Sequence, residues 1–241
     1  MTNDGIGYPL APIARLAALA PLDQSAISIL EEACARRFDV KAYRPVPSDL
    51  NDEPVMIVSG WAGRIRSSAS GRCLMVDLAL PGEIVRPIDR ASSTLTAITD
   101  LQVAVLPDAA AYSPLARAYV RSYQLTESYL MAQVARVALL DAQDRLLDLI
   151  TELLERVLVT NGSNSDCFDL PLKQRHLGEV LGLTSVHVNR MVRQLREEKR
   201  IIIARGSVQI PAGSPVGQHA RRNVEAIRAG SRFPQRVPFF R

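Results

Sequence analysis

The sequence has few cysteines and no long apolar run, and both absences exclude classes of protein. Its three cysteines, Cys34, Cys73 and Cys167, are far apart and odd in number. Disulfides are therefore not expected, and no Cys-x-x-Cys or Cys/His cluster offers a site for zinc or an iron–sulfur cluster. No apolar run approaches the ~18 residues that a membrane span needs, and the first eleven residues lack the basic start and apolar stretch of a secretion signal. We expect a cytoplasmic protein without metal or cofactor.

Catalytic patterns are missing as well. The sequence has no characteristic spacing of a nucleophile and a base, no pair of catalytic carboxylates and no phosphate-binding loop. With 47% hydrophobic and 22% charged residues, the composition is that of a globular protein. We therefore expect a globular binding protein that is not an enzyme.

Positive charge is concentrated near the C-terminus. The net charge of the chain is only +4, but residues 166–211 carry eight basic and five acidic side chains, and residues 212–241 carry six and one. Residues 1–165 are net acidic. The last third of the chain is therefore the part suited to a polyanion such as DNA.

Hydrophobic patterns divide the chain into a mixed N-terminal part and a helical second part. Residues 12–37 have helical periodicity, with a break and a new helix start at Pro21-Leu22-Asp23. Closely spaced short strands then favour an antiparallel sandwich or barrel. These strands are predicted from alternating runs between turns, at 55–58, 61–66, 73–80, 94–98 and 101–106.

A long helix is predicted after Pro114, followed by a second helix over 141–158. Residues of the long helix at intervals of three and four form a pattern close to a heptad seam, namely Tyr119, Tyr123, Thr126, Leu130, Val134 and Val137. Two interpretations remain open, a helix packed on its own domain and a dimerisation helix. The second is favoured because further apolar residues on the helix need covering, namely Leu115, Val120, Leu125 and Met131.

Residues 172–198 predict two helices joined by a tight turn. The first helix spans 173–181, and Gly182 supplies the positive φ that ends it. Gly178 is the small residue that lets the second helix cross the first closely. The second helix spans Thr184–Glu197, with Thr184 as its N-cap. The residues expected to be buried are Leu177, Val180 and Leu181 in the first helix and Val188, Met191, Val192 and Leu195 in the second.

The other side of the second helix suits the major groove of DNA. Arg190 offers a bidentate donor pair for guanine, Asn189 can pair with adenine, and Val186 fits a thymine methyl group. Apolar runs on either side of Arg205-Gly206 predict a β-hairpin, which completes a winged helix. We expect binding to double-stranded DNA, with base contacts from Ser185, Val186, Asn189 and Arg190 and phosphate contacts from Lys173, Gln174, Thr184 and Arg193.

The same segment resembles the Crp/Fnr family of bacterial transcription regulators. The likeness is carried by Leu-Pro-Leu at 170–172, Leu-Gly-Leu-Thr-Ser-Val-His-Val-Asn-Arg at 181–190 and Gln-Leu-Arg-Glu-Glu at 194–198. A looser likeness is carried by Ser-Gly-Trp-Ala at 59–62, Ser-Gly-Arg at 70–72 and Leu-Pro-Gly-Glu at 80–83.

The resemblance implies an α+β fold in four parts. These are an N-terminal antiparallel β-roll with flanking helices, similar to a cyclic-nucleotide-binding jelly roll (1–112), a dimerisation helix (113–138), a winged helix-turn-helix (139–211) and a basic tail (212–241). It also implies a homodimer whose two recognition helices bind a palindromic operator, with RNA polymerase as a further partner. The Glu that usually precedes the family's recognition Arg falls on Val186, so we expect a different half-site.

The effector site departs from the family. The Gly-Glu pair that holds cyclic AMP falls on Arg86-Pro87, and the Glu that binds the ribose is missing. Arg90 and Ser92, with Arg86, remain as an anion site, against the alternative of ordinary surface residues. The N-terminal cysteines and the histidine that other members use for a cluster or haem are also absent. We expect a regulator that cyclic AMP does not control; the alternative is a ligand-gated regulator whose N-terminal domain senses a nucleotide or another small metabolite.

Two further features leave alternatives open. Cys167 is a redox-sensitive thiol if it is exposed and has a lowered pKa, and an inert cysteine otherwise. The tail from Ala212 carries six arginines against one glutamate. It either adds non-specific phosphate contacts or is a solvated extension whose apolar end, 237–240, docks on the body of the protein.

Overall fold

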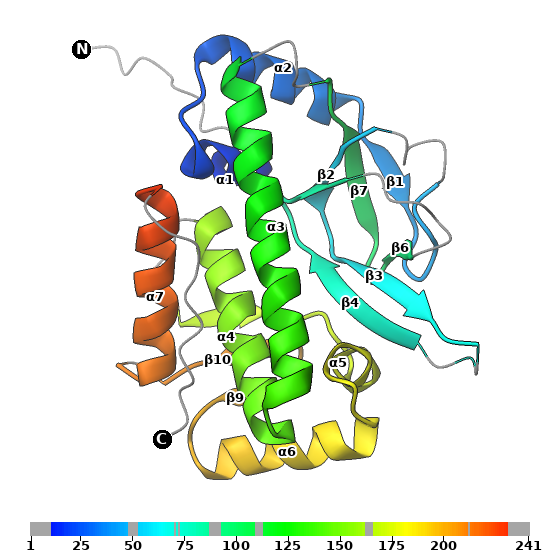
Figure 1. Cartoon of the computed structure of the whole chain (residues 1–241), viewed down its shortest axis with the longest axis vertical. Helices are drawn as coiled ribbons and strands as arrows, with labels where there is room; N and C mark the ends of the chain where they lie inside the picture. Colours follow the sequence, from blue (N-terminus) through cyan, green and yellow to red (C-terminus); the bar gives the residue numbers. More distant parts are fainter. Residues whose placement is uncertain are drawn as a thin grey trace.

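The computed structural model describes residues 11–47, 53–69, 71, 73–86, 93–108, 113–161, 166–211 and 213–230. Figure 1 shows a strand-rich N-terminal part, a long helix α3 that runs through most of the molecule's length, and a helical C-terminal part beside and below it. None of the described helices is long and apolar enough to cross a membrane. Residues 11–108 are called the N-terminal domain below.

The first described residues form two helices, α1 (Ala11–Leu19) and α2 (Gln24–Ala35). The predicted break between them is confirmed, because the Asp23 carboxylate accepts a hydrogen bond from the backbone N–H of Ala26 at 2.8 Å and so caps α2. Ile13 and Leu16 of α1 are fully buried. The first helix is therefore part of the core and not a peripheral segment.

The described part of the N-terminal domain contains two antiparallel sheets, which confirms the predicted β-roll. One sheet has the strand order β1-β7-β2-β5 and the other the order β4-β3-β6. The strands are β1 (Phe38–Val40), β2 (Val55–Ser59), β3 (Ala62–Ser67), β4 (Cys73–Ala79), β5 (Ile84–Val85), β6 (Thr94–Ala97) and β7 (Leu101–Val105). Although β6 and β7 follow each other in the sequence, they lie in different sheets. Among these strands, β1 and β5 were not predicted, since two or three residues are too few to show alternation.

Helix α3 (Ser113–Leu139) has the predicted length, but the predicted seam is wrong at one end. Tyr119 is only 3% exposed and packs in the core of its own chain, as do Leu115 and Leu125. The side of α3 that faces solvent instead carries Val120, Met131 and Val134, which are 50%, 65% and 64% exposed. Helix α1, strands β4 and β5 and helix α4 pack against the other sides of α3, and these neighbours, not the heptad spacing, decide which side is free.

After α3 the chain folds back into α4 (Ala142–Asn161), which lies beside α3 in Figure 1. A small antiparallel sheet with the order β8-β10-β9 and two helices complete this region. Their bounds are β8 (Cys167–Asp169), α5 (Gln174–Leu181), α6 (Ser185–Glu197), β9 (Ile202–Ala204) and β10 (Ser207–Gln209). The helix pair and hairpin that the sequence predicts are therefore present.

The region predicted as a basic tail contains a helix, α7 (Pro215–Arg228). The Ser214 hydroxyl caps it by accepting a hydrogen bond from the Gly217 N–H at 3.2 Å. Its apolar side is buried against α4 through Val216, Ala220, Val224 and Ile227. Residues 215–228 are therefore a packed element and not a solvated extension, while the apolar segment 237–240 lies outside the described residues.

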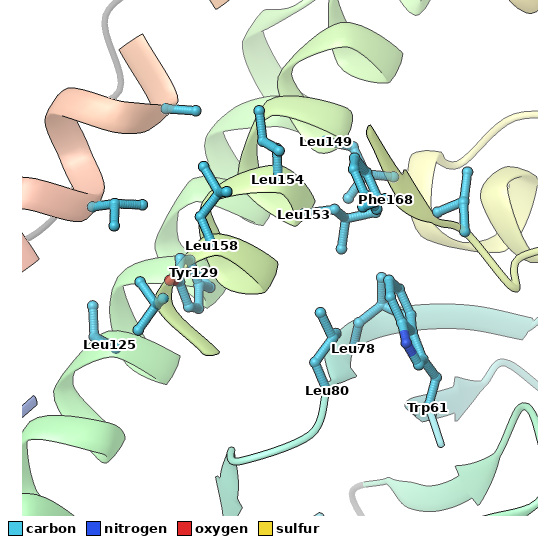
Figure 2. Packing of buried hydrophobic residues seen from close by; sticks show 14 of the residues in the cluster. Trp61, Leu78, Leu80, Leu125, Tyr129, Leu149, Leu153, Leu154, Leu158 and Phe168 are labelled. Carbon is cyan, nitrogen blue, oxygen red and sulfur yellow. The ribbon is translucent and has the colours of Figure 1, made fainter. Parts of the chain in front are cut away.

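One cluster of buried apolar side chains joins the N-terminal domain to the C-terminal part. Figure 2 shows Trp61, Leu78 and Leu80 of the N-terminal domain facing Phe168 of β8 and the leucines of α4, with Leu125 and Tyr129 of α3 alongside. Burial of apolar surface is the main stabilising contribution to folding. The two parts of the chain are therefore held in one arrangement by a shared core.

Candidate DNA-binding interface

The turn between α5 and α6 depends on two glycines. Gly182 ends α5 with φ +67°, the left-handed conformation that glycine adopts without strain. At Gly178 a Cβ atom would lie 2.6 Å from the carbonyl oxygen of Leu183, so any side chain there would collide with the turn. The backbone N–H of Leu183 donates to the Gly178 carbonyl at 2.9 Å. Both predicted glycine roles are confirmed, and together they fix the angle at which α6 leaves α5.

Helix α6 is capped and packed as predicted. The Thr184 hydroxyl accepts a hydrogen bond from the backbone N–H of His187 at 3.3 Å. Val188, Met191 and Leu195 are buried, and Val192 is half-buried. The inward side of α6 is therefore held against the domain along its whole length.

The outward side of α6 is free. Ser185, Val186, Asn189, Arg190 and Arg193 are all exposed, and Val186 is 75% exposed. Arg193 pairs with Glu197 one turn later at 3.3 Å, an exposed pair that costs little to break. The structure thus brings the four predicted base-contacting residues onto one solvent-facing surface.

A short hairpin follows α6. Strands β9 and β10 pair antiparallel, with Ala204 opposite Ser207. The two residues between them, Arg205 and Gly206, have φ of +52° and +78°. Two consecutive positive φ values are typical of the tight turn that suits a two-residue hairpin. The predicted wing is confirmed, and it carries an exposed arginine at its tip.

The start of α5 places its basic residues beside the N-terminal domain. Lys173, Gln174 and Arg175 are exposed. The ammonium of Lys173 lies 5.4 Å and the guanidinium of Arg175 4.9 Å from the centre of the Tyr43 ring. Tyr43 belongs to the loop after β1, so the predicted phosphate contact Lys173 is also a contact between the two parts of the chain. Arg175 was not among the predicted site residues, because only the fold brings Tyr43 to it.

Comparison with known proteins identifies this unit. Residues 144–212 match the family described as the Crp-like helix-turn-helix domain. They form a Crp-like helix-turn-helix domain. No curated protein matches the chain in sequence.

Solved structures extend the likeness beyond the Crp-like domain. FixK2 from Bradyrhizobium japonicum superposes with a TM-score of 0.60 at 17% identity, over 77% of this chain and 95% of that protein. A CRP-family transcriptional regulator from Thermus thermophilus gives a TM-score of 0.55 at 15% identity, over 84% and 100%. The c-di-GMP responsive global regulator CLP from Xanthomonas campestris gives 0.55 at 15% identity, over 76% and 98%. The chain therefore has the fold of Crp/Fnr regulators, and the predicted resemblance is confirmed.

Side chains from α3 and from the start of α4 hold the end of α5 in place. The Gln133 amide of α3 donates to the carbonyl of Val180 at 2.5 Å, and Arg145 of α4 donates to the carbonyl of Leu181 at 3.2 Å. Both carbonyls belong to the last turn of α5. The last C=O groups of a helix have no partner within the helix, so a donor or a cation near them is favourable. Neither residue stands out in the sequence, because nothing local indicates that α3 and α5 meet.

An open pocket of about 630 Å³ lies between the N-terminal domain and α3. Its lining includes Arg64 of β3, Arg86 after β5 and several residues of α3. Arg64 is only 8% exposed, its Nε has no hydrogen-bond partner among the described residues, and burial lowers its pKa. The guanidinium of Arg86 lies 3.9 Å from the centre of the Tyr123 ring. Arg90 and Ser92, the other predicted anion-site residues, lie outside the described residues.

The cysteines are dispersed. Cys34 is buried, which raises its pKa to about 11, whereas Cys73 and Cys167 are exposed. Cys167 lies on β8 beside a cleft between the N-terminal domain and α4. Its exposure meets one of the two conditions for a redox-sensitive thiol, and that role stays a prediction. The described residues contain no group of three or more His, Cys, Asp or Glu side chains that could hold a metal ion.

Proposed function

We propose that this protein is a sequence-specific DNA-binding transcription regulator of the Crp/Fnr type that acts as a homodimer in the cytoplasm. The observation that carries the proposal is the division of α6 into a buried side and a polar exposed side. Val188, Met191 and Leu195 anchor the helix, while Asn189 and Arg190 are presented to solvent. A helix held in this way can enter the major groove without unfolding its own domain. The function is recognition and involves no catalysis.

Each exposed residue of α6 has a proposed role. Arg190 donates two hydrogen bonds to a guanine, Asn189 pairs with an adenine, and Ser185 and Val186 complete the base contacts. Lys173, Gln174, Thr184 and Arg193 contact phosphates and fix the position of the helix along the groove. Val186 cannot accept a hydrogen bond from cytosine. The half-site should therefore differ from that of family members with an acidic residue at this place.

The proposal of a dimer rests on the free side of α3. Val120, Met131 and Val134 are exposed along it, and Leu139 at its end is 80% exposed. Exposed apolar residues aligned on one side of a long helix are typical of a helix that packs against a second copy. Two copies would present two α6 helices to one side of the duplex, which is the reason to expect a palindromic operator. Contact with RNA polymerase is part of the same proposal.

Selection of bound sites from random duplex DNA tests the DNA-binding proposal. We expect a palindrome with a guanine at the Arg190 position. Arg190→Ala should weaken binding to it by ~1–3 kcal/mol and relax the preference at that base. The matched control is Arg222→Ala on the exposed side of α7, which should leave the selected sequence unchanged. Retention of the guanine preference by Arg190→Ala would reject the assignment.

Sedimentation velocity tests the dimer. Met131→Glu together with Val134→Glu should convert the protein to a monomer and weaken operator binding, because two carboxylates would be buried in the proposed interface. Phe38→Glu is the control, since Phe38 on β1 is 45% exposed and lies outside α3. A wild-type protein that is monomeric both free and on DNA would contradict the proposal.

A second candidate function is ligand-gated regulation, and Arg64 is the observation that favours it. A buried guanidinium with an unpaired Nε at a cavity is suited to an anion. The motif for cyclic AMP is lost from the sequence, so the candidates are other nucleotides and small anionic metabolites. Titration calorimetry against a nucleotide panel should detect binding that Arg64→Gln abolishes. Absence of heat with every compound would remove nucleotide sensing.

A further inference from the structure

The β3–β4 hairpin of the N-terminal domain reaches the start of the recognition helix. Figure 1 shows β3 and β4 extending beside α5, on the side of the molecule where α6 begins. Between the hairpin and the helix-turn-helix lies an open cleft of about 620 Å³. One wall carries Arg66, Ser67 and Ser68 of the hairpin, and the other carries Arg175, Thr184 and Ser185.

The polar groups of this cleft suit a phosphodiester. Arg66 and Arg175 are exposed on opposite walls, and Glu179 is the acidic residue among the lining residues. Within the described residues, Arg66 has no carboxylate partner, so no internal ion pair competes for its guanidinium. The hydroxyl groups of Ser67 and Ser185 add hydrogen-bonding groups on both sides. Arginine is well suited to phosphate because its planar donors match two phosphate oxygens.

The position of the cleft determines which phosphate can occupy it. Thr184 and Ser185 are shared between the cleft and the surface proposed to face DNA. A DNA strand that reaches Thr184 would therefore run past the hairpin, and this path would bring one of its backbone phosphates between the two arginines. We propose that the β3–β4 hairpin is part of the DNA interface, with Arg66 and Arg175 holding one backbone phosphate from opposite sides of the cleft. This inference rests on the proposed function, since it requires α6 to bind DNA.

The proposal gives the N-terminal domain a direct part in DNA binding. A phosphate held by both walls would connect the N-terminal domain to the helix-turn-helix. Binding of DNA would then stabilise the contact between the N-terminal domain and the helix-turn-helix. Because this coupling is reciprocal, a change that separates these two parts would weaken DNA binding. The hairpin thereby provides a way for a change in the N-terminal domain to affect operator affinity without altering the recognition helix.

The test is the salt dependence of operator affinity for the full-length protein and single variants. Loss of one phosphate contact lowers the slope of log Kd against log salt by about one unit. Arg66→Ala should show this loss and bind about 3–10-fold more weakly near physiological salt, with unchanged base preference at every position. Arg66→Lys should keep most of the slope. Arg37→Ala is the matched control and should behave as wild type, because Arg37 is exposed and follows α2, a helix that lies at the opposite end of the molecule from α6 in Figure 1.

The remaining variants distinguish one shared phosphate from two separate contacts. If Arg66 and Arg175 hold the same phosphate, the double alanine variant should lose less than the sum of the two single losses. An unchanged slope for Arg66→Ala, or tighter binding, would overturn the proposal, because the hairpin would then be neutral or would restrain the domain. Inorganic phosphate at constant ionic strength should compete with DNA to the same extent for wild type and Arg66→Ala, because the proposed phosphate site requires the bound duplex. If wild type shows no sequence preference in DNA binding, the proposed function fails. If wild type shows a preference and Arg66→Ala binds DNA as wild type does, only the inference about the hairpin fails.

Discussion

Arg156 of α4 forms a buried, two-pronged ion pair with Glu83 of the N-terminal domain. The Arg156 Nε donates to Glu83 Oε1 at 2.9 Å, and Nη2 donates to Oε2 at 2.5 Å. Arg15 of α1 donates to the same carboxylate at 2.9 Å. Burial alone raises the pKa of Glu83, but Arg156 and Arg15 outweigh it and hold the pKa below its usual value. This carboxylate therefore joins α1, α4 and the β-roll.

Removing the Glu83 charge should be costly. Glu83→Gln would leave the buried guanidinium of Arg15 without a carboxylate partner among the described residues, and Arg156 would keep only Glu152 at 3.0 Å and Asp77 at 3.7 Å. Loss of one partner of a buried pair typically costs ~3–5 kcal/mol. Urea unfolding should show this decrease in the free energy of unfolding. Glu32→Gln is the control, because its pair with Arg36 on α2 is exposed and should contribute less than ~1 kcal/mol. Equal effects of the two substitutions would show that the buried pair is not important for stability.

Asp77 of β4 and His176 of α5 should have opposite effects on stability over the same pH range. Burial raises the pKa of Asp77 to about 6, so the folded protein binds this proton more tightly than the unfolded chain. Its contribution to stability is present at low pH and is lost as the pH rises from ~4 to ~6. Burial lowers the pKa of His176 to about 4, so the unfolded chain binds this proton more tightly. Its contribution is lost as the pH falls from ~6.5 to ~4.

The two contributions should partly cancel in the wild-type protein between pH ~4 and ~6.5. Asp77→Asn should leave a profile that rises with pH in this range, and His176→Gln a profile that falls. Each change should amount to ~1–3 kcal/mol across the range. Chemical unfolding at several pH values measures the slopes, which matter here more than the absolute stabilities. Three parallel profiles would contradict both pKa shifts.

Gly178→Ala should destabilise the helix-turn-helix although alanine favours helices. The added Cβ would lie 2.6 Å from the carbonyl oxygen of Leu183, a backbone atom in the turn that cannot move without shifting α6. We expect a loss of ~1–3 kcal/mol in unfolding free energy and weaker operator binding. Gly217→Ala in α7 is the matched control, since its nearest neighbour is the end of the Arg221 side chain at 3.2 Å. An operator affinity unchanged by Gly178→Ala would mean that the turn has room to adjust.

Helix α7 should contribute to stability and not to base recognition. Ile227 is 1% exposed against α4, and Ile227→Ala should cost ~2–4 kcal/mol in the unfolding free energy. Arg222→Ala on the exposed side should change stability by less than ~0.5 kcal/mol.

A chain that ends at Pro211 separates the two interpretations of the basic segment. Lower stability with an unchanged salt dependence of DNA binding would assign it a packing role, whereas a reduced salt slope would show phosphate contacts.

The helix-turn-helix could be predicted from the sequence, because its signals are local. The Thr184 cap, the Gly182 helix end and the spacing of Val188, Met191 and Leu195 all act within a few residues, so they can be recognised without knowledge of the rest of the fold. The β-roll strands of four or more residues were visible for the same reason. The helix α7 was also marked by Ser214-Pro215 and by apolar residues at intervals of three and four, although its arginines drew attention to charge alone.

Which surfaces are exposed and which distant residues meet depend on how the elements pack in the folded protein. The exposed side of α3 carries Val120 and Met131 and not Tyr119, because α1, α4 and the β-roll cover the rest of the helix. Glu83 and Arg156 are 73 residues apart, and no periodicity links them. Arg66 and Arg175 likewise come to one cleft only through the packing of the N-terminal domain on the helix-turn-helix. Side-chain spacing determines the faces of a helix, but the neighbours that pack against it determine which face is left for DNA or for a second copy of the chain.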